Sequence, residues 1–407
     1  MAWSPGLDDS TQLPSRVCDR WRSHFSCVAS SQDTHYSLDF FNLISSHFVD
    51  LTSASSSGPF DAPFSAPELA QALAQCHDSA PGHDGLPYSA FKPDLPWWRG
   101  MLLQFFNLVL HWNTVPAAWK ISTVVPVFKH GDPASPDQYR PISLASCAFK
   151  IFERLIYTRI APHISERLNE GQGGFRWGAD TMVYSLVDAL RLRRETHTFC
   201  AFVDIRKAFD TCWVEATLVR LFQVGVTGGM WRTIANFLCG TLSQVRTGSD
   251  VSHPWVDSGI AQGRVLFPCC SIYADDLVIF QESAADLQAA LDAVSHWGQQ
   301  WRFSFGIGPE KSAVVIFGPP RHALTCEVYL QGDLLPVVSA YRYLGVVLTP
   351  TLSWCNHVDH LVDRGRRLFA QCVSWVRSEG LPVSFSLFLL STYVRFFRYR
   401  IRGRVHP

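Results

Sequence analysis

The chain has 407 residues, of which 47% are hydrophobic and 17% are charged, with equal numbers of basic and acidic side chains. This composition excludes a wholly disordered chain and provides enough apolar residues for two or three packed units. The first twenty residues lack an apolar core and no apolar run reaches the ~18 residues of a membrane helix, so we expect neither a signal peptide nor a membrane span.

The twelve cysteines include no Cys-x-x-Cys pair, so neither a zinc finger nor a thioredoxin-type site is indicated. Cys269 and Cys270 are adjacent in an apolar context, which favours buried free thiols. Free thiols are typical of a reducing compartment, and we therefore expect an intracellular protein.

The amino-terminal third of the chain is predicted to be mainly helical. Residues 1–66 indicate a short helical lead and then a linker, because a serine-rich stretch and three prolines follow one another. Pro67 predicts the start of a helix, which ends in the turn-rich stretch 80–87. Aromatic and leucine residues at helical spacing predict a further helix over 97–118.

A basic strand-turn-strand segment follows. Residues 121–128 form a strand-like apolar run, residues 129–133 turn the chain, and the segment from Tyr139 runs into a helix through Arg159. Residues 119–176 contain eight basic and five acidic residues, which gives this segment a formal net charge of +3. Lys129 and Arg140 would suit a polyphosphate on such a hairpin, although a solvated basic surface is the simpler interpretation of these two residues alone.

The middle of the chain predicts a strand that ends in an acidic residue. After a helix over 181–194, the apolar run 199–203 delivers Asp204 at its carboxyl end, where substrates and metal ions commonly bind in sheet proteins. Asp210 is expected to cap a helix over 214–222. Another helix is predicted over 228–239, followed by a hairpin over 245–255.

Two adjacent acidic residues, Asp275 and Asp276, interrupt the apolar stretch 271–280. The pattern predicts strand, tight turn and strand, with Ala274 and Asp275 at the turn. Two neighbouring carboxylates repel each other, and a hard divalent cation relieves that repulsion. Asp204 is the third carboxylate that a two-metal site requires. The alternative is an exposed acidic turn without a metal.

The remaining residues predict helices and short strands. Ser283 and Asp286 form a capping box ahead of a helix that continues to Trp301. Short strands are expected over 303–307, 311–317 and 328–330, and a strand pair over 341–348 is broken at Gly345. Residues 361–407 hold nine arginines against two acidic residues, a balance of +7, with interleaved aromatic residues. This pattern suits a nucleic-acid backbone, and a solvated helix end is the alternative.

The order of the motifs resembles that of the reverse transcriptases of non-LTR (LINE-type) retrotransposons. The resemblance runs from about Pro81 to at least Leu348 and rests on several motifs in one order. These are Pro81-Gly82-His83-Asp84-Gly85, Asp137-Gln138-Tyr139-Arg140-Pro141-Ile142-Ser143-Leu144 with Phe149-Lys150-Ile151-Phe152-Glu153, Gly173-Gly174-Phe175-Arg176, Phe202-Val203-Asp204 with Ala208-Phe209-Asp210, and Tyr273-Ala274-Asp275-Asp276.

The resemblance implies an α+β fold shaped like a right hand. The fingers and an antiparallel palm sheet with helices are expected within 67–349, after the lead and linker region 1–66. A thumb-like, helical and arginine-rich region is expected over 350–407. The palm is expected to be incomplete, because the interval between Pro268 and Asp275 is short.

The resemblance also implies an RNA-directed DNA polymerase that acts on an RNA template, a DNA primer and deoxynucleoside triphosphates. Asp204, Asp275 and Asp276 would be the catalytic acids and would bind two Mg²⁺ ions, with Mn²⁺ as the alternative ion. No membrane partner is implied, the oligomeric state stays open, and a nuclear location follows if the chain acts in retrotransposition.

Other residues take their expected roles from the same resemblance. Lys311 resembles the lysine that protonates the leaving pyrophosphate. Phe209 corresponds to the steric gate that excludes a ribose 2′-hydroxyl. The nucleotide would further contact Lys129, Arg140, Gln262 and Gly263, and the primer grip would be Tyr343, Leu344 and Gly345. Core packing for Phe209 and a surface position for Lys311 are the ordinary alternatives.

The chain also departs from the family pattern. Ala261 and Phe267 stand where the family favours Pro and Ser. Only six residues separate Pro268 from Asp275, whereas a helix of three turns requires ~11 residues. The palm helix expected there has no room, so the alternative is an inactive remnant that at most binds nucleic acid. A metal-dependent nuclease using the same acids is a weaker hypothesis.

No endonuclease domain precedes the motifs and no zinc knuckle follows them. We therefore expect the chain to be one part of a longer polyprotein.

Overall fold

The computed structural model describes residues 14–30, 36–53, 56–129, 131–167, 179–257, 259–260, 265, 276–319 and 326–378. The chain divides into two compact units, each assembled from several segments. Unit 1 takes the described parts of 1–174, 205–274 and 295–304, and unit 2 takes those of 175–204, 275–294 and 305–407. The predicted boundaries at residues 66 and 349 stay a prediction.

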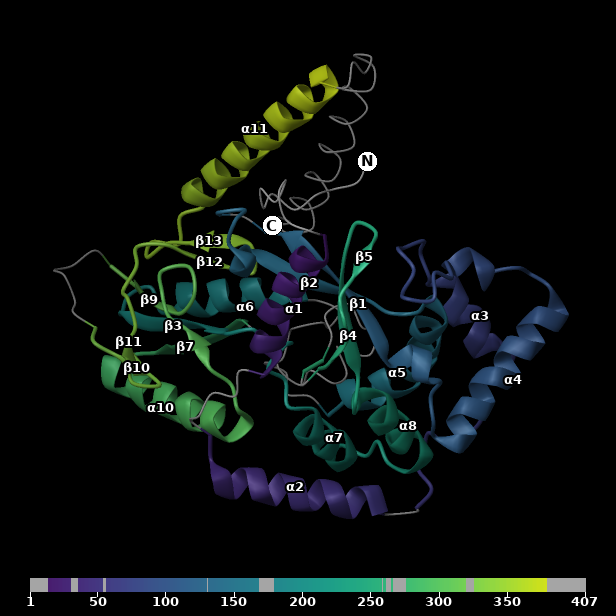
Figure 1. Cartoon of the computed structure of the whole chain (residues 1–407). Helices are drawn as coiled ribbons and strands as arrows, with labels where there is room; N and C mark the ends of the chain where they lie inside the picture. Colours follow the sequence, from purple (N-terminus) through teal and green to yellow (C-terminus); the bar gives the residue numbers. More distant parts are fainter. Residues whose placement is uncertain are drawn as a thin grey trace. The chain divides into compact units, whose positions relative to one another are not determined.

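Unit 1 contains helices around one mixed sheet (Figure 1). Its helices are α1 (Pro14–Ser30), α2 (Leu38–Ser53), α3 (Ala66–Ala74), α4 (Pro96–Trp112), α5 (Cys147–Ser165), α7 (Val214–Gln223) and α8 (Gly228–Leu238). Its strands are β1 (Ile121–Phe128), β2 (Tyr139–Leu144), β4 (Leu242–Thr247), β5 (Asp250–Val251) and β6 (Trp255–Val256). Short 3₁₀ turns occur at Tyr88–Ala90, Ala117–Lys120 and Pro136–Gln138.

The sheet of unit 1 has the strand order β2-β1-β4-β5, with β6 also paired to β4. Strands β1 and β2 form an antiparallel hairpin, whereas β1 and β4 are parallel. Helix α1 packs on this sheet, because Trp21 is fully buried against Tyr139 at a ring distance of 4.7 Å. The amino-terminal lead therefore belongs to the packed structure of unit 1.

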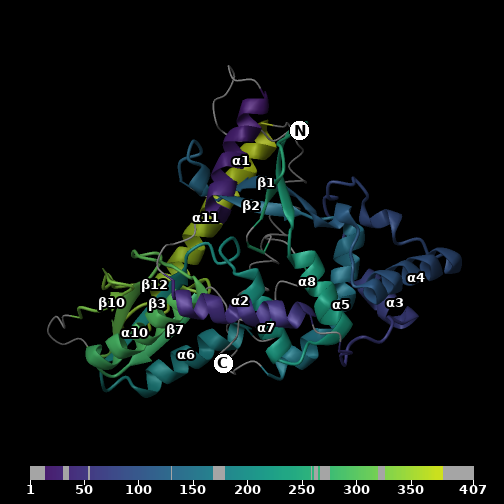
Figure 2. The same ribbon diagram turned by 60° about the horizontal axis from the view of Figure 1, so that its bottom comes forward.

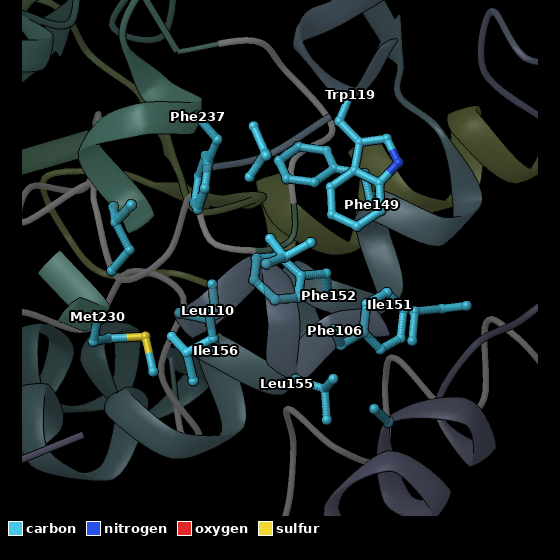
Figure 3. Packing of buried hydrophobic residues seen from close by; sticks show 14 of the residues in the cluster. Phe106, Leu110, Trp119, Phe149, Ile151, Phe152, Leu155, Ile156, Met230 and Phe237 are labelled. Carbon is cyan, nitrogen blue, oxygen red and sulfur yellow. The ribbon is translucent and has the colours of Figure 1, made fainter. Parts of the chain in front are cut away.

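The main core of unit 1 lies around α5, of which most residues are buried. Figure 3 shows how its aromatic side chains interlock. The ring of Trp119 lies 5.3 Å from that of Phe149 and 5.5 Å from that of Phe152, and Phe106 packs on Phe152 from α4. Such pairs add to the hydrophobic stabilisation of their buried area.

Unit 2 contains a second sheet with helices alongside it (Figures 1 and 2). Its helices are α6 (Ala179–Leu192), the first part of α10 (Ala284–Trp301) and α11 (Cys355–Ser378). Its strands are β3 (Thr198–Ile205), β7 (Asp276–Gln281), β8 (Phe305–Gly306), β9 (Ala313–Phe317), β10 (Tyr329–Leu330), β11 (Asp333–Leu334), β12 (Tyr341–Tyr343) and β13 (Val346–Leu348).

Strand β3 is the centre of the sheet in unit 2. It pairs antiparallel with both β7 and β9, and β8 also joins it. Alternate residues of a strand point to opposite faces, and Cys200 and Phe202 point into a core with α6 and the β12–β13 hairpin. Phe202 stacks on Tyr341 at 4.2 Å. The residues of β3 are almost all buried, and Asp204, which is partly exposed, is the exception.

Several predicted elements are confirmed. Strand β1 has the predicted bounds, α8 begins at Gly228, and β12 and β13 pair around a turn at Leu344 and Gly345. Cys76, Cys147, Cys200, Cys212 and Cys326 are buried free cysteines. Cys269 and Cys270, which are expected to be buried free thiols, lie outside the described residues. No described helix is both long and apolar enough to cross a membrane.

Two predictions are wrong. The helix predicted over 97–118 ends at Trp112, because Asn113 adopts a left-handed conformation with φ 52° that closes the helix. Asp210 does not cap α7, whose N-cap residue is Trp213. The intervening residues 207–211 fold into a turn in which the amide of Asp210 donates to the carbonyl of Lys207. The side chain of Asp210 is half-buried there instead of capping the helix.

Candidate active site

Asp204 lies at the carboxyl end of β3, as the sequence predicts. The antiparallel register between β3 and β7 places it directly opposite Asp276. Directly opposed residues have Cα atoms about 4.5–5.5 Å apart in such a ladder. Two acidic residues that are far apart in the sequence therefore meet across neighbouring strands. Asp275 and the side chain of Asp276 lie outside the described residues.

Lys311 contacts the same carboxylate. Its Nζ atom lies 2.9 Å from Oδ2 of Asp204, as both a hydrogen bond and an ion pair. The side chain of Asp204 is 23% exposed and that of Lys311 is 58% exposed, so the pair is accessible to solvent from the lysine side. The structure thus brings together two residues that the sequence analysis assigned to one site.

The short segment between β8 and β9 holds Lys311 in place. The amide of Lys311 donates to the carbonyl of Gly308 at 3.0 Å, and the amide of Ser312 donates to the carbonyl of Gly306 at 2.9 Å. The hydroxyl of Tyr341 donates to the carbonyl of Lys311. These hydrogen bonds hold the backbone of a tight loop on both sides of Lys311.

Ser312 and Gly306 shape the position of Asp204, and the sequence analysis assigned a role to neither. The hydroxyl oxygen of Ser312 accepts a hydrogen bond from the amide of Asp204 at 3.0 Å. A Cβ atom at Gly306 would lie 3.0 Å from Oδ2 of Asp204 and 3.4 Å from Cδ of Lys311. Glycine therefore leaves the space in which the ion pair forms. In the sequence, the two glycines of the Gly-Ile-Gly stretch ahead of Lys311 could have indicated a close backbone approach at this position.

Whether these residues fit a divalent ion depends on their donor atoms. Among the described side chains, no group of three or more His, Cys, Asp or Glu residues is close enough to hold a metal. Asp204 supplies carboxylate oxygens, which suit Mg²⁺, and the backbone of Asp276 lies beside it. The carboxylate of Asp204 therefore has the donor chemistry that a hard cation prefers.

Phe209 and Asp210 lie in unit 1, just beyond the end of β3. Phe209 is half-buried against the main core of unit 1, as the alternative of core packing predicts. Its carbonyl accepts a hydrogen bond from the amide of Ile260 at 3.0 Å. A Cβ atom at Gly259 would lie 2.4 Å from the carbonyl oxygen of Asp210, so only glycine fits there. Gln262 and Gly263 lie outside the described residues.

The surroundings of Asp210 alter the pKa of its carboxyl group. Burial raises the pKa of Asp210 to about 6, and the charge of Asp257 adds to this effect, while Lys207 and Lys129 oppose it. A buried carboxyl group favours its neutral form because the charged form loses hydration.

Lys129 and Arg140 lie on the β1–β2 hairpin of unit 1. The amide of Lys129 donates to the carbonyl of Gln138 at 2.8 Å, and Arg140 pairs with Val127 in the antiparallel register. Both side chains are exposed. They therefore share one hairpin, as the sequence predicts.

Tyr343, Leu344 and Gly345 form the end of the β12–β13 hairpin in unit 2. Leu344 has φ 46° and Gly345 has φ 83°, as a tight turn of this type requires. The ring of Tyr343 is buried 5.4 Å from that of Phe202. Tyr343 thus has a core-packing role in addition to any contact with a ligand.

The structure also explains why position 82, in the first motif, is a glycine. A Cβ atom there would lie 2.5 Å from the amide nitrogen of Ser146 and 2.6 Å from the carbonyl carbon of Ala145. The loop therefore packs directly on the backbone between β2 and α5. The motif Gly173-Gly174-Phe175-Arg176 and the arginine-rich residues 379–407 lie outside the described residues.

Comparison with known proteins gives a consistent result. The model of the family "Reverse transcriptase (RNA-dependent DNA polymerase)" matches residues 127–348. The chain is 29% identical over 353 residues to a protein named as a probable RNA-directed DNA polymerase from transposon X-element of Drosophila melanogaster. It is 28% identical over 341 residues to the RNA-directed DNA polymerase from mobile element jockey of the same species.

A third relative is the retrovirus-related Pol polyprotein from type-1 retrotransposable element R2 of Popillia japonica, at 26% identity over 313 residues. The alignments cover 77%, 73% and 66% of this chain in the same order. They cover 38%, 36% and 42% of the relatives. The chain therefore spans less than half the length of each of these three proteins.

Proposed function

This chain belongs to the reverse transcriptase family, in the branch found in non-LTR retrotransposons, and we propose that it is an RNA-directed DNA polymerase that extends a DNA primer on an RNA template. The observation that supports this proposal most directly is the meeting of three motif residues in unit 2. Asp204 lies opposite Asp276 in the sheet and is paired with Lys311 at 2.9 Å.

In the proposed reaction, Asp204, Asp275 and Asp276 hold two divalent ions, Mg²⁺ or Mn²⁺. When bound, these ions would activate the primer 3′-hydroxyl and neutralise the charge of the leaving pyrophosphate. Lys311 balances the charge of Asp204 in the free protein and donates a proton to the pyrophosphate during transfer.

The remaining motif residues take roles in binding. Lys129 and Arg140 bind the triphosphate from the β1–β2 hairpin, with Arg140 acting through its planar guanidinium group. The ring of Phe209 excludes the ribose 2′-hydroxyl, and Gln262 and Gly263 contact the incoming nucleotide. Tyr343, Leu344 and Gly345 hold the primer. In this proposal, β3 with its partners is the palm, the β1–β2 hairpin belongs to the fingers, and α11 begins the thumb.

Primer extension tests the proposal. The purified chain is given an RNA template, a labelled DNA primer, deoxynucleoside triphosphates and Mg²⁺. We expect extension that is lost in Asp204→Asn and in the double variant Asp275→Ala, Asp276→Ala. Asp292→Asn is the matched control, because this exposed aspartate of α10 hydrogen-bonds only Gln288 among the described contacts. Equal extension by the wild type and the double variant would refute the proposal.

A second candidate is a polymerase-fold protein that binds nucleic acid without catalysis. The observation that favours it is the interval of six residues between Pro268 and Asp275, which is too short for a helix of three turns. In that case the wild type binds a primer-template in a fluorescence anisotropy titration, extends no primer with Mg²⁺ or Mn²⁺, and loses no affinity in the double variant.

A further inference from the structure

Helix α4 is apolar on the side that faces away from the core of unit 1. Five large hydrophobic side chains on it are exposed, namely Trp97 (66%), Met101 (49%), Phe105 (40%), Leu108 (46%) and Trp112 (68%). At 100° per residue these five positions fall within an arc of about 80°. We call this row the α4 stripe. It is about 22 Å long, at 1.5 Å per residue.

The opposite side of α4 packs into the core of unit 1. Leu102, Phe106, Val109 and Leu110 are buried in the main core of unit 1, where Phe106 packs on Phe152. A surface helix of a monomer is polar on its outer side, whereas a helix that is apolar all round is normally buried all round. A continuous exposed apolar row of this kind therefore marks an interaction surface.

The sequence of the stripe is nearly the same in both directions. The spacings between its members are four, four, three and four residues, with a tryptophan at each end. In an antiparallel pair of such helices, Trp97 of one copy lies near Trp112 of the other, and Met101 lies near Leu108. A two-fold axis then passes close to Phe105. Such self-complementarity is the defining property of an isologous dimer interface.

The charge and the exposed area of the α4 stripe are compatible with a second copy of this chain as the partner. The one Lys, Arg, Asp or Glu residue in α4 is Arg99, which lies off the stripe and pairs with Asp94 at 3.3 Å. A second copy therefore meets no like charge. The stripe exposes roughly 550 Å² per copy, since a large aromatic side chain offers about 150–250 Å². Complete burial of both stripes would remove about 1,100 Å² from solvent, which is above the ~1,000 Å² that a biological interface should clear and places the dimer at the small end of such interfaces.

We propose that the α4 stripe is a homodimer interface in which α4 packs antiparallel against α4 of a second copy of this chain. This inference concerns unit 1 and does not depend on the proposed catalytic activity.

The test uses sedimentation of the full chain over a range of concentrations. We expect the wild type to dimerise and Met101→Glu and Leu108→Lys each to raise the dimer dissociation constant at least about tenfold, as for central residues of an interface. Circular dichroism should be unchanged, because both side chains are exposed. Val362→Glu is the control, since Val362 is 44% exposed on another helix, α11.

Mixing the two variants tests the antiparallel register. A heterodimer places the new carboxylate at position 101 opposite the new ammonium at position 108, which neither homodimer can do. Native mass spectrometry should therefore show the heterodimer in excess over both homodimers. A monomeric wild type at roughly 100 μM, a dimer that Met101→Glu leaves intact, a dimer lost in Val362→Glu, or a mixture without excess heterodimer would each overturn the proposal. A monomeric wild type would assign the stripe to another occupant.

Discussion

Nζ of Lys311 lies 2.9 Å from Oδ2 of Asp204, although 107 positions separate the two residues in the chain. The pair forms at the end of a buried strand, and the short loop after β8 presents the lysine to it. In the proposed reaction, a metal ion would replace Lys311 beside Asp204, and the lysine would then be available for proton transfer.

Replacement of Lys311 by methionine should reduce nucleotide incorporation at least about 10²-fold, because the proposed proton donor is lost. Stability should change by less than about 1 kcal/mol, since the lysine is largely exposed. Primer extension and thermal unfolding measure the two effects. Lys311→Arg retains the positive charge and should keep the pairing. Full activity of the methionine variant would contradict the assigned role.

Gly306→Ala should lower the rate of incorporation by roughly tenfold to a hundredfold, because a Cβ atom 3.0 Å from Oδ2 of Asp204 displaces the carboxylate. Gly365→Ala in α11 is the matched control, since a Cβ atom there meets nothing within 4 Å. Single-turnover primer extension gives the comparison. Equal rates for the two variants would show that the space at Gly306 is not required.

Asp210 should make the stability of the protein depend on pH. Its pKa is raised in the folded state to about 6 from an ordinary value of 3.8. The folded state therefore binds more protons than the unfolded state between about pH 4 and pH 6, and stability falls as the pH rises through this window. The loss amounts to at most about 3 kcal/mol.

Asp210→Asn removes this titration, so its denaturation midpoint should fall less between pH 4.5 and pH 6.5 than that of the wild type. Urea unfolding at several pH values measures the difference. The control is Asp292→Asn, which should keep the pH dependence of the wild type. Parallel curves for the wild type and Asp210→Asn would contradict the prediction.

Arg159 should contribute more to stability than an exposed arginine. It forms a partly buried ion pair with Glu68 at 2.7 Å and lies 4.3 Å from the ring centre of Phe64. Arg159→Lys loses the planar, multidentate contact and should lower the stability of unit 1 by about 1–3 kcal/mol. Arg194→Lys, in an exposed pair with Glu195, should change it by less than about 0.5 kcal/mol. Chemical denaturation of both variants gives the comparison, and equal midpoints would refute the prediction.

The sequence analysis was most accurate where a local pattern determines the structure. The apolar run of β1, the glycine at the start of α8 and the break of the strand pair at Gly345 were all predicted, because alternation and turn chemistry act within a few residues. It failed at Asp210, where helix-capping statistics were outweighed by the burial of the side chain within unit 1. It also missed Ser312 and Gly306, whose importance depends on a residue more than a hundred positions away.

The sequence by itself indicated the family and the position of Asp204 at the end of a strand, and it suggested candidate residues for the site, which remain a prediction. These conclusions need only short motifs in a fixed order. The tertiary structure alone decided that Asp204 faces Asp276 across the sheet, that Lys311 pairs with Asp204, and that the α4 stripe stays exposed. The physical reason is that strand register and side-chain burial follow from packing between distant segments, which no local pattern of residues contains.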